Sequence, residues 1–340
     1  MSQRENPAFF EISAPGIRCR LSALGASIVS VEVPDRRGTF TNIALSPRNF
    51  QSGDADPSLA GRTVGPCCGR VRDGLITIDG QQYQLEKNEG TNHIHGGTSG
   101  CPHQVWRGEQ LSPAHVRFRL DLPDGLAGYP GNRALCADYT ATDNALHVVY
   151  SATTDRPTWL CMTNHAYWDL SGRFDGSAMG QSLELAADRV IYNDAQQLPG
   201  EIVPTAGGAF DFSAPAAFES KLEQFPQDEQ LLAGRGFNNI FPLNPDMQSA
   251  RGFCARLASP LTGIRMTLQS DQPAIVLYSG GFLDARTQLD GSPAGPGCAI
   301  AIEAEEVPDP FHLPGVEPAI LRPADQWQRS ICWSFDIIEQ

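Results

Sequence analysis

The segment from Thr163 to Gly172, with the sequence TNHAYWDLSG, places a histidine just before an aromatic pair. An imidazole titrates near neutral pH, so His165 can give up a proton at working pH and take it back. A hydrogen-bonded structural histidine beside Tyr167 and Trp168 is the more common arrangement in proteins. The segment therefore supplies a candidate acid, and the rest of the chain must supply its partner.

A second histidine cluster lies in the segment NHIHGG, residues 92–97. If this segment is a strand, His93 and His95 project from one face, as a metal site would require. A cupin-like metal centre also needs a carboxylate three or four residues later, where this chain has Thr-Ser. Two other interpretations are a turn with hydrogen-bonded histidines and a site where the glycines let a ligand approach His95. We expect no metal here.

A carboxylate suited to pair with an imidazole lies in the segment CAIAIEAEE, residues 298–306. If the isoleucines face the core, the alanines and Glu303 share the opposite face, which would form a shallow ligand floor ending in a charge. A strand facing solvent would have the same pattern. Glu305 lies on the same face and Glu306 is adjacent, so spacing alone does not choose among the three.

Arg70 follows the Gly-containing segment PCCG and precedes a predicted hairpin turn at Asp79-Gly80. A guanidinium held in such a loop offers fixed, planar donors to ligand oxygens, and the alternative is a surface ion pair. The chain has no Walker loop, no GxGxxG after a strand and no GxSxG elbow, which disfavours nucleotide chemistry and α/β-hydrolase chemistry.

Most of the chain alternates apolar and polar residues with the period of β-strands. With 33 Gly and 26 Pro the sequence favours many short strands joined by turns. One helix is predicted, over residues 213–225, with Ser213 as its cap. We expect residues 1–340 to form one all-β domain of antiparallel strands. The predicted strands cover residues 17–21, 29–33, 75–78, 82–85, 116–122, 146–153, 160–164, 182–185, 264–268, 275–279, 298–303 and 331–337.

The composition is that of a folded globular protein, with 41% hydrophobic and 19% charged residues. The net charge of −14 disfavours nucleic acid and anionic membranes as partners. Nine cysteines without a CxxC pair, and an N-terminus without an apolar signal region, predict a cytoplasmic protein with free thiols. Cys67 and Cys68 are expected to be small buried hydrophobic residues.

In this order the motifs resemble the aldose 1-epimerase (galactose mutarotase) family along essentially the whole chain. The resemblance rests on LGASIVSVEVPDRRG, GRVRDGLITIDGQQYQL, NHIHGG, TNHAYWDLSG, LPGEIVP, FDF, YSGGFL, IEAEEVPD and LRPADQW. Each motif is short, but their collinear order is specific.

The resemblance implies a large antiparallel β-sandwich of the galactose-mutarotase type with few short helices, no cofactor, and a cleft for a monosaccharide. Its motifs imply that His165 is the general acid and Glu303 the general base, on opposite sides of the sugar. Arg70 and His95 would bind sugar oxygens. The implied reaction interconverts the α and β anomers of a hexose or related aldose; the oligomeric state is left open.

Three positions depart from the family pattern. Gly69 stands where the family usually has Asn, Asn238 where it has a sugar-binding Asp, and Val276 where it has Gln. Asn238 keeps an acceptor oxygen for a sugar hydroxyl but loses the charge. These changes leave the particular aldose undetermined.

The same departures keep open a non-catalytic carbohydrate-binding or sugar-sensing protein on this fold. Another alternative is a metal-dependent β-barrel isomerase using His93, His95 and His165. A third is a sugar-phosphate 1-epimerase, which the acidic composition and the lack of a basic cluster near the motifs disfavour.

Overall fold

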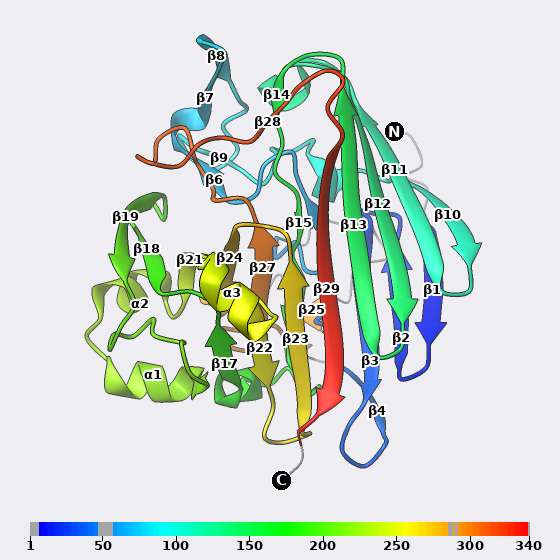
Figure 1. The fold of residues 1–340 in the computed structure, drawn as a ribbon, viewed down its shortest axis with the longest axis vertical. Coiled ribbons are helices and arrows are strands. Elements are labelled where there is room, and N and C mark those ends of the chain that lie inside the picture. Colours follow the sequence, from blue (N-terminus) through cyan, green and yellow to red (C-terminus); the bar gives the residue numbers. More distant parts are fainter. Residues whose placement is uncertain (1–6, 47–56, 285–287, 290–291, 339–340) are drawn as a thin grey trace.

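A computed structural model describes residues 7–46, 57–284, 288–289 and 292–338. Its strands form two facing layers, and the described part has three short α-helices, all in the left half of the view (Figure 1). Every strand pair within it is antiparallel, and many pairs are hairpins between consecutive strands. The architecture predicted from the sequence, a large antiparallel β-sandwich, is confirmed.

The first layer is a nine-stranded sheet in the order β10-β11-β12-β13-β29-β23-β22-β17-β20. Its strands are β10 (Arg107–Ser112), β11 (His115–Leu122), β12 (Arg133–Thr142), β13 (Ala145–Thr154), β17 (Ser182–Leu185), β20 (Ala216–Ala217), β22 (Ala255–Ala258), β23 (Ile264–Ser270) and β29 (Trp327–Ile337).

The second layer combines a four-stranded and a six-stranded sheet, ordered β1-β2-β3-β4 and β16-β27-β24-β21-β18-β19. A bridge between Ala44 and Trp168 joins them. Their strands are β1 (Phe9–Ala14), β2 (Ile17–Ser22), β3 (Ser27–Pro34), β4 (Phe40–Asn42), β16 (Tyr167–Trp168), β18 (Arg189–Asn193), β19 (Pro199–Pro204), β21 (Asn238–Pro242), β24 (Ala274–Tyr278) and β27 (Ile300–Glu305).

Short strand pairs and helices complete the described chain. The pairs are β5 (Thr63–Val64) with β15 (Thr163–Asn164), β6 (Arg70–Val71) with β9 (His93–Ile94), β7 (Leu75–Ile78) with β8 (Gln81–Gln84), β14 (Thr158–Trp159) with β28 (Ile320–Leu321), and β25 (Gln288–Leu289) with β26 (Ser292–Pro293). The α-helices are α1 (Phe218–Gln224), α2 (Glu229–Gly234) and α3 (Pro245–Arg251), and single 3-10 turns cover Arg72–Gly74, Cys101–His103, Leu126–Gly128 and Ser177–Gly180.

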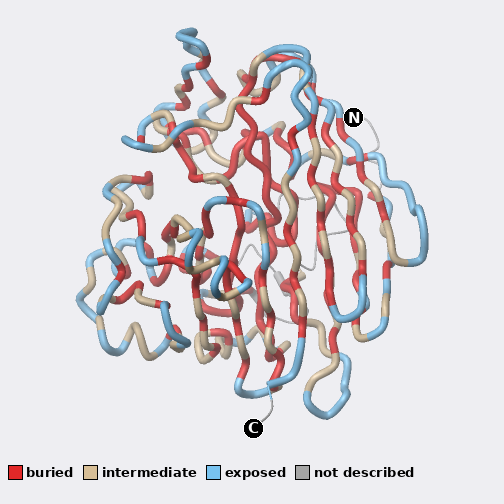
Figure 2. The backbone as a smooth tube through the Cα atoms, viewed as in Figure 1, coloured by how far each residue is buried: buried red, intermediate tan, exposed pale blue. Residues whose placement is uncertain are grey.

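The core lies between the layers. Buried residues from both contribute to one hydrophobic cluster, including Ile300 and Ile302 of β27, Trp333 of β29, and Val31 of β3. Figure 2 shows buried positions along the middle of the strands and exposed positions at the hairpin ends. Because β27 turns alternate residues toward this core, Glu303 must point to the outer face of the six-stranded sheet.

The predicted helix over 213–225 is too long. Ala216 and Ala217 instead pair with β17 as an edge strand, and the helix begins only at Phe218. The prediction that Cys67 and Cys68 are buried is confirmed, and all nine cysteines are free thiols.

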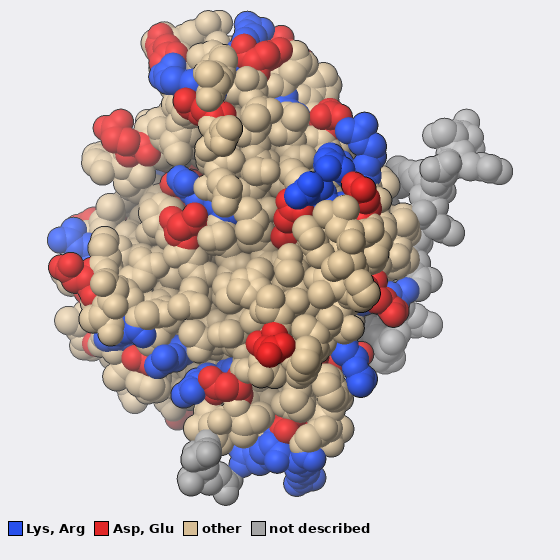
Figure 3. All heavy atoms as spheres, turned by 45° about the vertical axis from the view of Figure 1, so that its right-hand side comes forward, with Lys and Arg blue, Asp and Glu red and all other residues tan. Residues whose placement is uncertain are grey.

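No α-helix in the described ranges is long and apolar enough to cross a membrane. Figure 3 shows acidic and basic side chains scattered over the face in view, often next to one another, around a broad uncharged area. The net charge of −14 is therefore not gathered into a single patch on this face.

Candidate active site

A cavity of about 490 Å³ lies on the outer face of the six-stranded sheet. It brings together side chains that are far apart in the sequence. All five residues singled out as site candidates line it: Arg70, His95, His165, Asn238 and Glu303. The fold therefore gathers these candidates around one space.

Glu303 reaches the cavity from β27, a central strand with neighbours on both sides. Its Cα pairs with that of Val276 on β24, and its side chain is almost completely buried yet lines the cavity. The expectation that the adjacent alanines form the cavity floor is wrong. Ala299 and Ala301 pack instead in a buried apolar cluster with Tyr167 and Leu283.

His165 lies in the short connection between β15 and β16. Its backbone is fixed on both sides, since its N–H donates to the Arg62 carbonyl and its carbonyl accepts from the Gly61 N–H, each at 2.9 Å. Its ring stacks on Tyr167 with 4.8 Å between ring centroids. The Tyr167 hydroxyl in turn donates to the Ser58 carbonyl, so the imidazole has a fixed orientation.

The imidazole and the carboxylate are direct neighbours. Nε2 of His165 lies 3.6 Å from Oε1 of Glu303, and the two side chains are 8% and 4% exposed. This separation is too short for a sugar ring to lie between the groups, so their expected placement on opposite sides of the substrate is wrong. Both groups therefore face the cavity side by side.

Burial shifts the acid–base properties of this region. Removal from water raises the pKa of Glu303 from 4.5 to about 8, because the charged carboxylate loses its solvation. Burial likewise raises the pKa of Glu305 well above its ordinary value, with further contributions from Cys161 and from Glu303. Two carboxyl groups on one strand face thus favour their protonated forms.

His93 and His95 do not share a face, contrary to the strand interpretation. β9 ends at Ile94, and His95 adopts a left-handed backbone with φ of 51°. His93 is buried, with Nδ1 2.6 Å from the Glu86 carbonyl and Nε2 2.8 Å from the Tyr129 hydroxyl, whereas His95 lines the cavity. Within the described ranges no three His, Cys, Asp or Glu side chains group together to hold a metal ion.

The ring of His95 is held by a hydrogen bond from the backbone of Gly69. The Gly69 N–H donates to Nδ1 of His95 at 3.3 Å, so the proton of the neutral ring belongs on Nε2. Burial, followed by the charges of His165 and Arg70, lowers the pKa of His95 well below its ordinary value. His95 is therefore suited to donate a hydrogen bond.

A Cβ at Gly96 would overlap the Gly65 carbonyl, so this glycine serves backbone packing and not ligand access.

Arg70 lines the cavity and forms an ion pair with another lining residue, Glu89. Its Nε and Nη2 donate to the two carboxylate oxygens of Glu89 at 2.7 and 2.8 Å. Glu89 was not among the residues predicted from the sequence. Glu89 lies near Arg70 because β6 pairs with β9, which places Arg70 opposite Ile94. No pattern in the sequence predicts that pairing.

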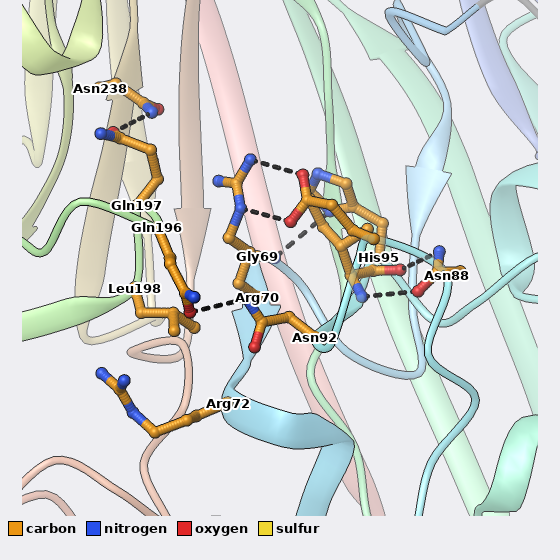
Figure 4. Close-up of polar contacts among 12 residues, drawn as sticks. Gly69, Arg70, Arg72, Asn88, Asn92, His95, Gln196, Gln197, Leu198 and Asn238 are labelled. Carbon is orange, nitrogen blue, oxygen red and sulfur yellow. Dashed lines mark hydrogen bonds and ion pairs between the residues drawn. The ribbon is translucent and has the colours of Figure 1, made fainter.

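Asn238 is hydrogen-bonded to Gln197, which was also not predicted from the sequence. Its side-chain N–H donates to Oε1 of Gln197 at 2.9 Å, and both residues line the cavity. Figure 4 shows this pair on one side of Arg70 and His95 on the other. Gln197 has a left-handed backbone with φ of 59° in the connection before β19, and it brings an amide to a cavity in which Val276 offers only an apolar surface. Tyr278 and Phe282 also line the cavity with aromatic rings, and neither was predicted to be a site residue.

Comparisons with known proteins place the chain in a family. Residues 9–332 match the sequence profile of the family described as aldose 1-epimerase. Galactose mutarotase of Bos taurus is 28% identical over 330 residues, covering 96% of this chain and 94% of the relative. Aldose 1-epimerase of Escherichia coli K12 is 27% identical over 319 residues, covering 92% and 90%.

Solved structures give the same result for the fold. An aldose epimerase homologue from C. elegans superimposes with a TM-score of 0.89 at 26% identity, covering 98% of this chain and all of that one. Galactose 1-epimerase from Lactobacillus acidophilus gives a TM-score of 0.82 at 27% identity, with 98% and 99% covered. With the family profile spanning nearly the whole sequence, the chain belongs to the aldose 1-epimerase family.

Proposed function

We propose that this protein is an aldose 1-epimerase that interconverts the α and β anomers of a hexose or related aldose. The observation that carries the proposal is the 3.6 Å approach of His165 Nε2 to Glu303 Oε1 inside a cavity of monosaccharide size, in a chain of this family. The two large sheets share one hydrophobic core, which supports a single domain over residues 1–340.

Anomer exchange requires one proton to leave the anomeric hydroxyl and another to reach the ring oxygen. These two oxygens are bonded to the same carbon, C1, so neighbouring groups can serve both. Glu303 takes the proton from O1, the C1–O5 bond breaks with its electron pair moving to O5, and His165 delivers a proton there. The product is the open-chain aldehyde.

Rotation about C1–C2 then exposes the other face of the carbonyl. His165 takes back the O5 proton as O5 attacks C1, and Glu303 returns its proton to O1, so both side chains finish as they began. The raised pKa of Glu303 brings the carboxyl into the range where imidazoles titrate. Glu303 acts as the base in its ionised form, which is the minor form at neutral pH and a stronger base than an ordinary carboxylate.

The other cavity residues would hold the sugar in place. His95 can donate from Nε2, and Arg70 can donate to an oxygen on which charge develops. Asn238 and Gln197 offer amides to hydroxyl groups. A cytoplasmic location belongs to the same proposal and is supported by the nine free thiols.

Freshly dissolved α-galactose and α-glucose are expected to reach anomeric equilibrium faster with the protein than without it, as followed by polarimetry. Heat-denatured protein at equal concentration serves as the control for buffer catalysis. If no aldose equilibrates faster while calorimetry detects sugar binding, the protein is a carbohydrate-binding protein and the catalytic proposal is wrong.

A further inference from the structure

Glu89 is the feature of the cavity that the epimerase chemistry does not use. It makes a two-point ion pair with Arg70, whose side chain is 22% exposed, while that of Glu89 is 39% exposed. Both residues line the cavity. The pair is therefore positioned at the substrate space and not on the outer surface.

The loop that carries Glu89 is braced at both ends. The backbones of Glu89 and Asn92 exchange two hydrogen bonds, at 3.1 and 2.9 Å. The Asn88 side chain accepts from the Ile94 N–H and donates to the Ile94 carbonyl, as Figure 4 shows in part. Because the loop is held in this way, Glu89 is preorganised opposite Arg70 and does not need substrate to reach it.

The charges around the cavity are unbalanced toward the acidic side. Arg70 is the one Lys or Arg among the described lining residues, whereas Glu89 and Asp284 are both acidic, and burial favours the uncharged forms of Glu303 and Glu305. The lowered pKa of His95 keeps that ring neutral. With Glu89 neutralising Arg70, the described lining offers no uncompensated cation to a negatively charged ligand.

Hydrogen bonding adds a second constraint. Nη1 of Arg70 makes no hydrogen bond with another described residue, so it can donate to a ligand oxygen. The Glu89 carboxylate can only accept further bonds. A sugar hydroxyl satisfies both partners, since it accepts from Arg70 and donates to Glu89. A carboxylate or phosphate dianion offers no donor and would lie against the carboxylate.

We propose that Glu89 is a specificity-determining residue that restricts the site to uncharged aldoses and rejects uronates and sugar phosphates. The proposal rests on the epimerase function proposed above. In it, Arg70 alone would attract an anionic group, and Glu89 converts the same guanidinium into a binder of hydroxyl groups.

The first test uses the unmodified protein and two ligands that differ in charge. Exchange of galacturonate and of its neutral methyl ester is measured by NMR, with galactose as the reference. We expect the ester to be turned over and the free acid to have a kcat/KM lower by about tenfold or more, as expected when one charged contact becomes repulsive. Equal kcat/KM for acid and ester, or rejection of both, would overturn the proposal.

The second test is Glu89→Gln, which keeps the shape of the side chain and removes its charge. The ratio of kcat/KM for galactose over galacturonate is expected to fall by about tenfold. Asp79→Asn is the matched control, because Asp79 makes a similar two-point pair with Arg322 away from the cavity. For Asp79→Asn, the ratio of kcat/KM for galactose over galacturonate should equal that of the wild type. If folded Glu89→Gln still turns over galactose and its ratio is unchanged, the proposed role of Glu89 is wrong. If the wild type itself turns over no aldose, the proposed epimerase function is wrong.

Discussion

Glu303→Gln is expected to lower kcat for anomer exchange by about 10²- to 10⁴-fold, because an amide cannot take the proton of the anomeric hydroxyl. KM for galactose should change much less, since glutamine keeps the size and hydrogen-bonding reach of the side chain. Steady-state polarimetry over a range of galactose concentrations separates the two constants. Circular dichroism establishes that the variant is folded.

Glu305→Gln is the informative comparison for this substitution. Glu305 lines the same cavity from the same strand face, but its carboxyl interacts with Cys68 and Cys161, whereas Glu303 adjoins the His165 ring. We expect Glu305→Gln to cost less than about tenfold in kcat. A larger loss of kcat for Glu305→Gln than for Glu303→Gln would show that Glu305, and not Glu303, is the base.

The same Glu303→Gln substitution should stabilise the protein in alkaline solution. The folded-state pKa of Glu303 is raised from 4.5 to about 8, so the folded state holds a proton that the unfolded chain has already released. The stabilisation from this protonated carboxyl is fully present below pH 4.5 and is lost as the pH rises through about 8. Glutamine has no such loss, because it does not ionise.

The expected readout is the difference in Tm between variant and wild type at pH 5 and at pH 9. The Tm of the variant relative to that of the wild type should be higher at pH 9 than at pH 5. The corresponding gain in the free energy of unfolding is at most about 5 kcal/mol, at about 1.4 kcal/mol per pKa unit. Comparing two pH values cancels any cost of glutamine that is independent of pH. A Tm difference that stays constant with pH would show that Glu303 does not carry a raised pKa.

Strands with strong apolar contrast were predictable from sequence. β29 alternates Ile331, Trp333 and Phe335 inward with polar residues outward, and the structure confirms its buried face. β12 was missed although it spans ten residues. Its buried face includes Arg133 and the small Ala137 and Ala141, so the alternation in hydrophobicity is too weak to recognise.

The short helices were missed for a different reason. α2 and α3 have recognisable caps, since the side chains of Asp228 and Asn244 accept from backbone N–H groups of the first turn. Each helix has only six or seven residues, which is too few to establish an apolar period. The start of α1 was misplaced because pairing with β17, a tertiary contact, holds Ala216 and Ala217 in a strand.

Sequence motifs identified the side chains of the site but did not predict which of them contact one another. The sequence indicated His165 and Glu303, and the fold brings them together in one cavity. It did not indicate that they are neighbours, because this depends on β16 pairing with β27 beside the core. Glu89 and Gln197 act through loop conformations that leave no spacing pattern. Partners across loops are thus the part of a site that single-sequence analysis loses first.

The measurement that tests the central claim most directly is anomer exchange of galactose by NMR in His165→Asn, Glu303→Gln and the double variant, compared with the wild type. If the two groups act on one hemiacetal in one step, each single variant loses about a hundredfold or more, and the double variant is little slower than the slower single one. A folded single variant that keeps a rate within a few fold of the wild type would contradict the account.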